Sequence, residues 1–391
     1  MMAILLRLKR LCGFLFGMVF FFSGLIKLMD PVGAGLVVRE YFDFMHLGFM
    51  APAAKTFGVA LALAETLIGA ALVSGVWRKT FGMAALIMQS AFTLITLFLL
   101  IFNPEMDCGC FGEAIHLTHL QTFVKNLILL ALILLYFFPN KHLGEPKRKK
   151  YVSFGIVSIS CVAFMVYSLM YIPLVDFTAY KPGAELLAAV SDGGDDIYEA
   201  VFTYEKDGQK QDFTLDALPD STWTFVSTDT RLKGGPAENT AELSIFDSRT
   251  QAYADSLAAK GKVMVISLYD TDIDQQGWDK IGRIASDAAA NGIRPLILAT
   301  ETETVPETLK AFAYTSDYKT LISLNRSNGG ITYFNDGSLV KKWASRTVPS
   351  TDEIKTLAAN DATETSIDYE SKGSLGFQGF LLYVSAVLLL L

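Results

Sequence analysis

Five long apolar stretches dominate residues 1–173, and they constrain the fold more than any other feature of the sequence. They cover residues 11–29, 51–77, 81–102, 122–139 and 151–172. A helix needs about 20 residues, at 1.5 Å each, to cross a bilayer. A bilayer leaves no water to pair with the backbone, so such stretches cross it as helices. This part of the chain is predicted to be a membrane α-helical bundle.

Basic residues cluster in alternate connections between these stretches. They lie at positions 7–10, at 78–79 and in the segment 141–150. The positive-inside rule then predicts a cytoplasmic N-terminus and a cytoplasmic segment 141–150. Five crossings leave residue 174 onward in the periplasm of a bacterial inner membrane, where disulfides persist. A cleaved signal peptide is the alternative for the first stretch, but no A-x-A site follows it.

The remainder of the chain differs in charge from the apolar part. Residues 1–173 hold 14 Lys and Arg against 8 Asp and Glu, whereas residues 174–391 hold 19 against 32. Neither part has the basic surface that nucleic-acid binding requires, so no nucleic-acid partner is predicted. The four cysteines are too few for a disulfide scaffold. We expect Cys12 and Cys161, which lie inside spans, to be small apolar filling.

The loop before the fourth stretch carries Cys108-Gly109-Cys110. Gly109 tolerates the backbone angles of a small, strained disulfide, and strained, exposed disulfides tend to be labile or catalytic. Lys125 and the N-terminal end of the fourth helix both favour a thiolate. Cys108 and Cys110 are therefore the predicted catalytic pair. The alternatives are two structural thiols, or a metal pair completed by two loop histidines, His116 and His119, whose spacing is weak for zinc.

Three ionisable residues fall inside apolar stretches, where charges are costly and mark functional sites. Lys27 and Lys125 lie near the ends of their stretches, so both can extend to the membrane surface. Glu65 lies mid-span and predicts an interior polar site for a proton or a quinone, or a neutral structural carboxyl. It lies roughly 12 Å deeper than Lys27 at 1.5 Å per residue, so a direct ion pair between them is not predicted.

Three motifs resemble the DoxX/MauE superfamily of redox-associated membrane proteins, over about residues 10–140. They are SGLIKLMDP at 23–31, AETLIG at 64–69, and DCGCFG at 107–112 followed by TFVKN at 122–126. The most similar branch is that of Bacteroidota, in which this bundle is fused to an extracytoplasmic domain. The resemblance implies a four-helix core over residues 1–140, similar to vitamin K epoxide reductase-like proteins, and a role in thiol redox traffic. Lys27, Asp30, Glu65 and Lys125 would then support the two cysteines.

Residues 176–240 are predicted to form a β-hairpin region, because strand-like runs at 197–204 and 211–215 flank Lys206-Asp207-Gly208. From residue 241 strands and helices alternate, which predicts a βαβ core. The predicted strands are 241–246, 263–269, 295–299, 320–324, 331–335 and 339–342, and the predicted helices are 250–259, 278–291, 306–313 and 351–358.

This order over residues 241–360 resembles the α/β thioredoxin fold. The part of the chain from 174 to 391 holds no cysteine. The segment 269–274 stands where the fold carries Cys-x-x-Cys, and Gly329 stands where it carries a cis-proline. The soluble domain is therefore expected to bind a client or partner protein rather than exchange disulfides itself.

The last apolar stretch, 375–391, is predicted to be a sixth span, and 141–173 a basic loop with the fifth helix. The sequence thus predicts an integral inner-membrane protein that takes part in extracytoplasmic thiol–disulfide traffic. If it is an enzyme, it is a thiol–disulfide oxidoreductase whose electrons pass to a membrane quinone or to a periplasmic redox partner. One alternative is a non-enzymatic scaffold or assembly factor whose soluble domain binds a partner. Another is a solute- or lipid-handling membrane protein that uses Glu65.

Overall fold

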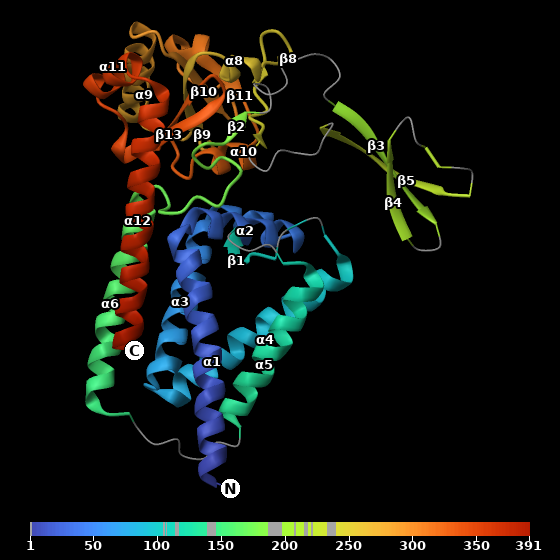
Figure 1. Cartoon of the computed structure of the whole chain (residues 1–391), viewed down its shortest axis with the longest axis vertical. Coiled ribbons are helices and arrows are strands. Elements are labelled where there is room, and N and C mark those ends of the chain that lie inside the picture. The colour runs from blue at the N-terminus through green and yellow to red at the C-terminus, as the bar shows by residue number, and fades with distance from the viewer. Residues whose placement is uncertain are drawn as a thin grey trace. The chain divides into compact units, whose positions relative to one another are not determined.

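The computed structural model describes residues 2–104, 106, 108–113, 117–138, 146–186, 198–206, 209–214, 218–219, 222–232 and 240–391. The chain divides into two compact units (Figure 1). Residues 1–177 and 371–391 form a helical unit, and residues 178–370 form a unit built mainly on β-sheet.

Six helices of the described part are long and apolar enough to cross a membrane. The five predicted spans are confirmed as helices, and the predicted sixth stretch is the C-terminal part of a longer helix. They are α1 (Met2–Met29), α3 (Ala54–Ser74, preceded by the 3-10 helix Gly48–Ala53), α4 (Arg78–Phe102), α5 (His119–Phe137), α6 (Arg148–Met170) and α12 (Ala362–Leu390).

Small residues bring α1 and α3 unusually close together. A Cβ atom on Gly24 would lie 2.4 Å from Thr66 Oγ1, and one on Gly69 would lie 2.3 Å from Phe21 N. Small residues at helix interfaces let backbones approach, which is a common basis of helix association in membranes. This contact fixes the face of α1 that carries Lys27 against the face of α3 that carries Glu65.

A helix that the sequence analysis did not assign, α2 (Pro31–Phe44), follows α1 directly and packs against α3. Asp30 caps it by accepting a hydrogen bond from Gly33 N at 2.9 Å, and Pro31 occupies the first helical position. An Asp-Pro pair of this kind is a standard start signal for a helix. Asp30 therefore fixes where α2 begins.

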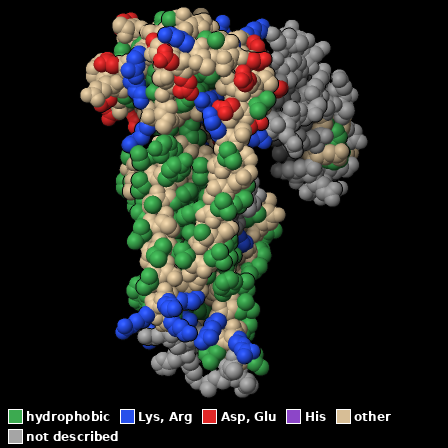
Figure 2. All heavy atoms as spheres, turned by 60° about the vertical axis from the view of Figure 1, so that its left-hand side comes forward, with side chains coloured by type: hydrophobic (Ala, Val, Ile, Leu, Met, Phe, Trp, Pro, Cys, Tyr) green, Lys and Arg blue, Asp and Glu red, His purple; other side chains and the backbone are tan. Residues whose placement is uncertain are grey.

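The exposed face of the helical unit is largely apolar (Figure 2). Lysine and arginine side chains gather at one end of this face (Figure 2). In the sequence, Lys147 precedes α6, and Arg148, Lys149 and Lys150 form its first turn. Cys12 and Cys161 are both buried in hydrophobic clusters of this unit, as expected, and the hydroxyl of Tyr383 lies 3.8 Å from Cys161 Sγ.

The second unit contains a mixed nine-stranded sheet among the described residues. Its order is β6 (Thr240–Ala241), β2 (Glu185–Leu186), β13 (Ser338–Trp343), β12 (Gly330–Asn335), β9 (Lys262–Leu268), β10 (Arg294–Ala299), β11 (Ala313–Thr315), β7 (Phe246–Asp247) and β8 (Ala252–Tyr253). Strands β9, β10 and β11 are parallel neighbours, and β12 runs antiparallel to β9.

Each face of this sheet is covered, and β9 shows why. Its residues alternate between two cores: Met264, Ile266 and Leu268 contact one, whereas Val263 and Val265 contact the other. The period of two follows from strand geometry, and a strand buried on both faces is apolar throughout. Helices α9 (Gln275–Ala290) and α11 (Thr351–Ala359) contribute to the first core, and α10 (Tyr318–Leu324) contributes to the second.

Several predicted elements of this unit are wrong. The predicted strand 320–324 belongs to helix α10. Asp317 caps this helix by accepting a hydrogen bond from Thr320 N at 2.8 Å, and Leu321 and Leu324 pack against the sheet. The predicted helix 250–259 is strand β8 followed by one helical turn, Ser256–Ala259. The predicted helix 306–313 is the 3-10 helix Glu307–Phe312 leading into β11, and the predicted strand 241–246 is interrupted between β6 and β7. Packing overrides local propensity in such short segments.

The predicted hairpin is confirmed. Strands β3 (Tyr198–Lys206) and β4 (Gln209–Thr214) pair antiparallel with Lys206 opposite Gln209. Strand β5 (Thr224–Leu232) pairs antiparallel with the other edge of β3, which completes a three-stranded sheet.

Candidate functional site: a thiol pair beside a buried ion pair

Cys108 and Cys110 flank a sharp backbone turn in the helical unit. Both are thiols in the structure; Cys108 is buried and Cys110 is half-buried. Gly109 between them has φ +57°, and a Cβ atom there would lie 2.2 Å from Val37 Cγ1 of α2. Only glycine suits this position, because a side chain would be strained and would collide with α2.

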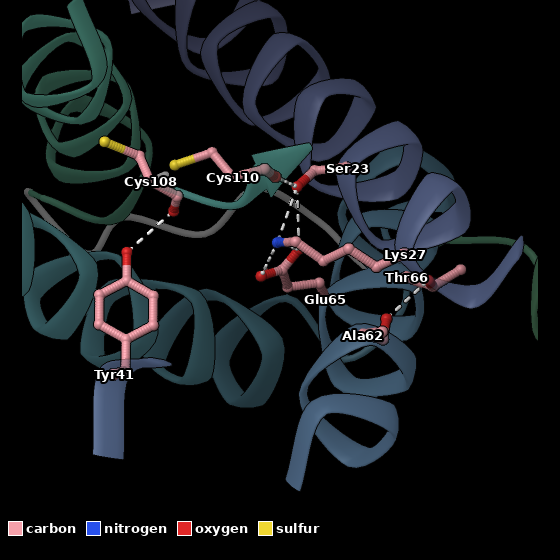
Figure 3. Close-up of polar contacts among 8 residues, drawn as sticks. All are labelled: Ser23, Lys27, Tyr41, Ala62, Glu65, Thr66, Cys108 and Cys110. Atoms are coloured by element: carbon pink, nitrogen blue, oxygen red, sulfur yellow. Dashed lines mark hydrogen bonds and ion pairs between the residues drawn. The ribbon is translucent and has the colours of Figure 1, made fainter. Parts of the chain in front are cut away.

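Two hydroxyl groups hold the carbonyls of the cysteine pair (Figure 3). Tyr41 of α2 donates to Cys108 O at 2.8 Å, and Ser23 of α1 lies 2.7 Å from Cys110 O. Burial, followed by the charges of Cys110, Cys108 and Glu40, raises the pKa of Tyr41 well above its usual range. The phenol therefore keeps its proton and remains a hydrogen-bond donor to the loop.

His119, the first residue of α5, contacts the buried thiol. Its Nδ1 lies 3.1 Å from Cys108 Sγ, and its Nε2 lies 3.0 Å from Pro104 O. A carbonyl only accepts, so the Nε2 proton donates to Pro104 and Nδ1 faces the sulfur. In this tautomer Nδ1 can take the thiol proton, and the imidazolium can then stabilise the thiolate. The N-terminal end of α5 adds positive potential at the same place.

Lys27 and Glu65 form a buried ion pair, which differs from the expectation based on depth along the helices. Lys27 Nζ lies 2.8 Å from both carboxylate oxygens of Glu65, and the two side chains are 10% and 1% exposed. A lysine side chain on a helix extends back over the preceding turn. Lys27 Nζ accordingly lies 3.3 Å from Ser23 Oγ, one turn earlier in α1. An estimate of depth from the number of residues along the helix axis does not include the length of the lysine side chain.

Ser23 links the ion pair to the cysteine loop. Its hydroxyl lies 2.9 Å from Glu65 Oε2 and 2.7 Å from Cys110 O (Figure 3). A hydroxyl has one proton, so it cannot donate fully to two acceptors. Ionised Glu65 competes with the Cys110 carbonyl for this proton, whereas protonated Glu65 would itself donate and leave Ser23 to hold the loop.

An apolar cavity of about 250 Å³ lies between these groups, and Cys108, Cys110, Ser23, Lys27 and Glu65 all line it. Its walls come from α1, α2, α3, α4 and α5. The aromatic and aliphatic lining includes Phe20, Phe92, Ile95 and Leu129. The thiol pair and the ion pair therefore border one chamber within the membrane helices.

The structure brings most of the predicted site residues together around this chamber. Lys125 is half-buried and lines it with Cys108, Cys110, Lys27 and Glu65, whereas Asp30 caps α2. His116, proposed in sequence as a metal ligand, lies outside the described residues. Within the described ranges no group of three or more His, Cys, Asp or Glu residues could hold a metal ion.

Four residues that line or contact the site were not assigned their observed roles from the sequence, although His119 was considered there as a metal ligand. His119 follows Thr118, which forms a capping box with Gln121, so a Thr-x-x-Gln pattern marked its place in a first helical turn. Ser23 precedes Lys27 by four residues and therefore shares its helix face. Gln89 is a polar residue inside an apolar span, which is itself a functional signal. Tyr41 had no sequence signal, because α2 was not assigned.

Comparison with known proteins gives two family matches. The family described as Methylamine utilisation protein MauE matches residues 2–139, the part that holds α1 to α5. The family described as Domain of unknown function (DUF8463) matches residues 198–234, which include β3, β4 and β5. No curated protein and no solved structure matches the chain. Residues 2–139 thus match the MauE family, in a chain whose described part holds six helices long and apolar enough to cross a membrane.

Proposed function

We propose that this protein is a membrane thiol–disulfide oxidoreductase whose redox centre is Cys108 and Cys110. The contact of 3.1 Å between Cys108 Sγ and His119 Nδ1 is the observation that carries the proposal. A thiolate is the reactive form of cysteine, and a histidine beside a thiol is a common way to generate it. Cys12, by contrast, is buried in a cluster of apolar side chains.

The proposed reaction couples the thiol pair to a two-electron acceptor, a membrane quinone or a periplasmic redox partner. Oxidation joins Cys108 and Cys110 through one sulfur–sulfur bond and releases two protons and two electrons. His119 receives the proton of Cys108 at Nδ1. Reduction by a client dithiol reverses the step, since thiolate attack on a disulfide passes through a mixed disulfide. Cys110 is the better-placed partner for a client, because it is half-buried and Cys108 is buried.

The sheet-based unit is proposed to be a thioredoxin-like domain that binds a client or partner without redox chemistry of its own. Support comes from the parallel pair β9 and β10 joined through α9, followed by the antiparallel hairpin β12–β13 and the closing helix α11. The absence of cysteine after residue 173 supports a binding role.

Substituting His119 by alanine is expected to slow alkylation of the reduced pair at pH 7 by about tenfold or more, because the thiol loses its proton acceptor. The measurement is the rate of iodoacetamide labelling, with mass spectrometry to separate Cys108 from Cys110. His46→Ala, in a loop after α2, is the matched control. Equal Cys108 labelling in His119→Ala and the unmodified protein would remove His119 from the mechanism.

The proposed orientation places the N-terminus and residues 146–150 in the cytoplasm and residues 178–370 in the periplasm of a bacterial inner membrane. A cysteine replacing exposed Glu301 is expected to react with a membrane-impermeant maleimide in intact spheroplasts, because charge asymmetry places it outside. A cysteine replacing exposed Lys149 should react only after permeabilisation. The reverse pattern would contradict the orientation.

A further inference from the structure

We propose that the cavity beside the thiol pair binds the headgroup of a membrane quinone, and that Gln89 Oε1 accepts a hydrogen bond from the hydroxyl of the reduced quinol. This inference rests on the proposed thiol–disulfide function and names its electron acceptor. It is carried by one unpartnered buried atom together with the chemistry of the cavity wall.

Gln89 of α4 lines the cavity and is fully buried. Its Nε2 donates to Asn126 O at 3.0 Å, which fixes the orientation of the amide, because the opposite orientation would set two acceptors against each other. Its Oε1 has no hydrogen-bond partner among the described residues. An unpaired buried acceptor is unfavourable, so a ligand that supplies a hydrogen-bond donor here is stabilised.

The polar neighbours of Gln89 are already engaged and leave this one acceptor for the ligand. Asn126 Nδ2 lies 3.2 Å from Thr96 Oγ1 and 3.4 Å from Phe92 O. Lys27 Nζ has three hydrogens and three acceptors, namely Ser23 Oγ and both Glu65 oxygens. The remaining wall is mostly apolar, so the occupant is an apolar body with a hydroxyl group.

The size of the cavity matches one ring system. A cavity of 150 Å³ engineered in another protein holds benzene, so about 250 Å³ has room for a benzoquinone or naphthoquinone ring. Phe20 and Phe92 line the chamber and offer flat apolar surfaces to such a ring. An acyl chain would fill the same space but would leave Gln89 Oε1 unpaired.

Cys108 and Cys110 line the same chamber, which defines the chemistry of the occupant. Closing their disulfide releases two electrons and two protons. A quinone takes up two electrons and two protons, and each carbonyl oxygen becomes a hydroxyl. The balanced step is two thiols plus quinone giving one disulfide plus quinol. Gln89 Oε1 pairs with a hydroxyl and not with a carbonyl, so this contact forms with the product.

The test uses the purified full-length protein in lipid nanodiscs, with a short-chain benzoquinone, a short-chain naphthoquinone and the corresponding quinols as probes. The quinol is expected to protect Cys110 from alkylation in a saturable manner. The quinone is expected to oxidise the reduced cysteine pair, and thiol trapping measures the loss of free thiols. Gln89→Leu should raise the quinol concentration for half-protection about tenfold, the effect of one lost hydrogen bond. Gln378→Leu, an exposed glutamine in α12, is the matched control.

A second variant fills the chamber without touching Gln89. Val38→Phe, on the α2 wall, is expected to abolish quinol protection while iodoacetamide still reaches Cys110 in the absence of quinol. Equal quinol protection in Gln89→Leu and the unmodified protein, or no saturable protection in the unmodified protein, would overturn the quinone site. Oxidation of the pair by a soluble disulfide but not by either quinone would overturn the quinone site and leave the proposed thiol–disulfide function standing. Inertness toward both oxidants would instead overturn the proposed function.

Discussion

Replacing both Cys108 and Cys110 by serine is expected to abolish thiol–disulfide exchange, with a loss of about 10³-fold or more, because serine oxygen forms no bond that a client thiolate can attack. Residues that act as one unit lose activity in a strongly non-additive manner. Either single variant, Cys108→Ser or Cys110→Ser, should therefore be almost as inactive as the double variant. The measurement is the rate at which the oxidised protein is reduced by a client dithiol.

The control uses the two cysteines of the apolar cores. Cys12→Ala and Cys161→Ala remove a thiol without touching the site and should keep the full exchange rate. The double variant with serine at both Cys108 and Cys110 also distinguishes the proposed redox function from a role as a membrane scaffold. Full complementation of a deletion strain by Cys108→Ser, Cys110→Ser would favour the scaffold and contradict a redox role.

Replacing Lys27 by methionine is expected to lower the free energy of unfolding by about 3–5 kcal/mol, because it leaves Glu65 as an uncompensated buried charge. Glu65 is 1% exposed, so water cannot replace the lost ammonium. Combining Lys27→Met with Glu65→Leu removes both charges, and an apolar pair in this place is expected to restore stability to within about 1 kcal/mol of the unmodified protein. Thermal and denaturant unfolding in detergent micelles measure the three proteins.

Lys55→Met is the matched control for this cycle, since Lys55 lies at the start of α3 with an exposed side chain. It should change the free energy of unfolding by less than about 0.5 kcal/mol. A Lys27→Met protein as stable as the Lys55→Met control would show that Glu65 has another partner in the folded state. The cycle would then report no coupling between the two residues.

The membrane helices were predictable from the sequence, because each depends on a local quantity. The length of an apolar run decides whether a segment can cross a bilayer, and α1, α3, α4, α5 and α6 follow from that alone. Strands β9 and β12 were also predictable, since each is a short, mostly apolar run with turn signals around it. Helix α10 was not, because the β-branched character of Thr320 and Ile322 indicated a strand while its cap and its packing produced a helix.

The sequence by itself determined that Cys108 and Cys110 share a glycine turn before α5, and that Lys27 and Glu65 lie in the membrane part. Only the tertiary structure decided what these groups contact. Glu65 lies 38 positions from Lys27 and 42 from Ser23, and Ser23 lies 87 positions from Cys110. Such partners depend on how closely α1 and α3 pack and on how far a lysine side chain extends along its helix, and neither quantity is local. The unpaired oxygen of Gln89 arises in the same way, because whether an amide finds a partner is decided by the helix that packs against it.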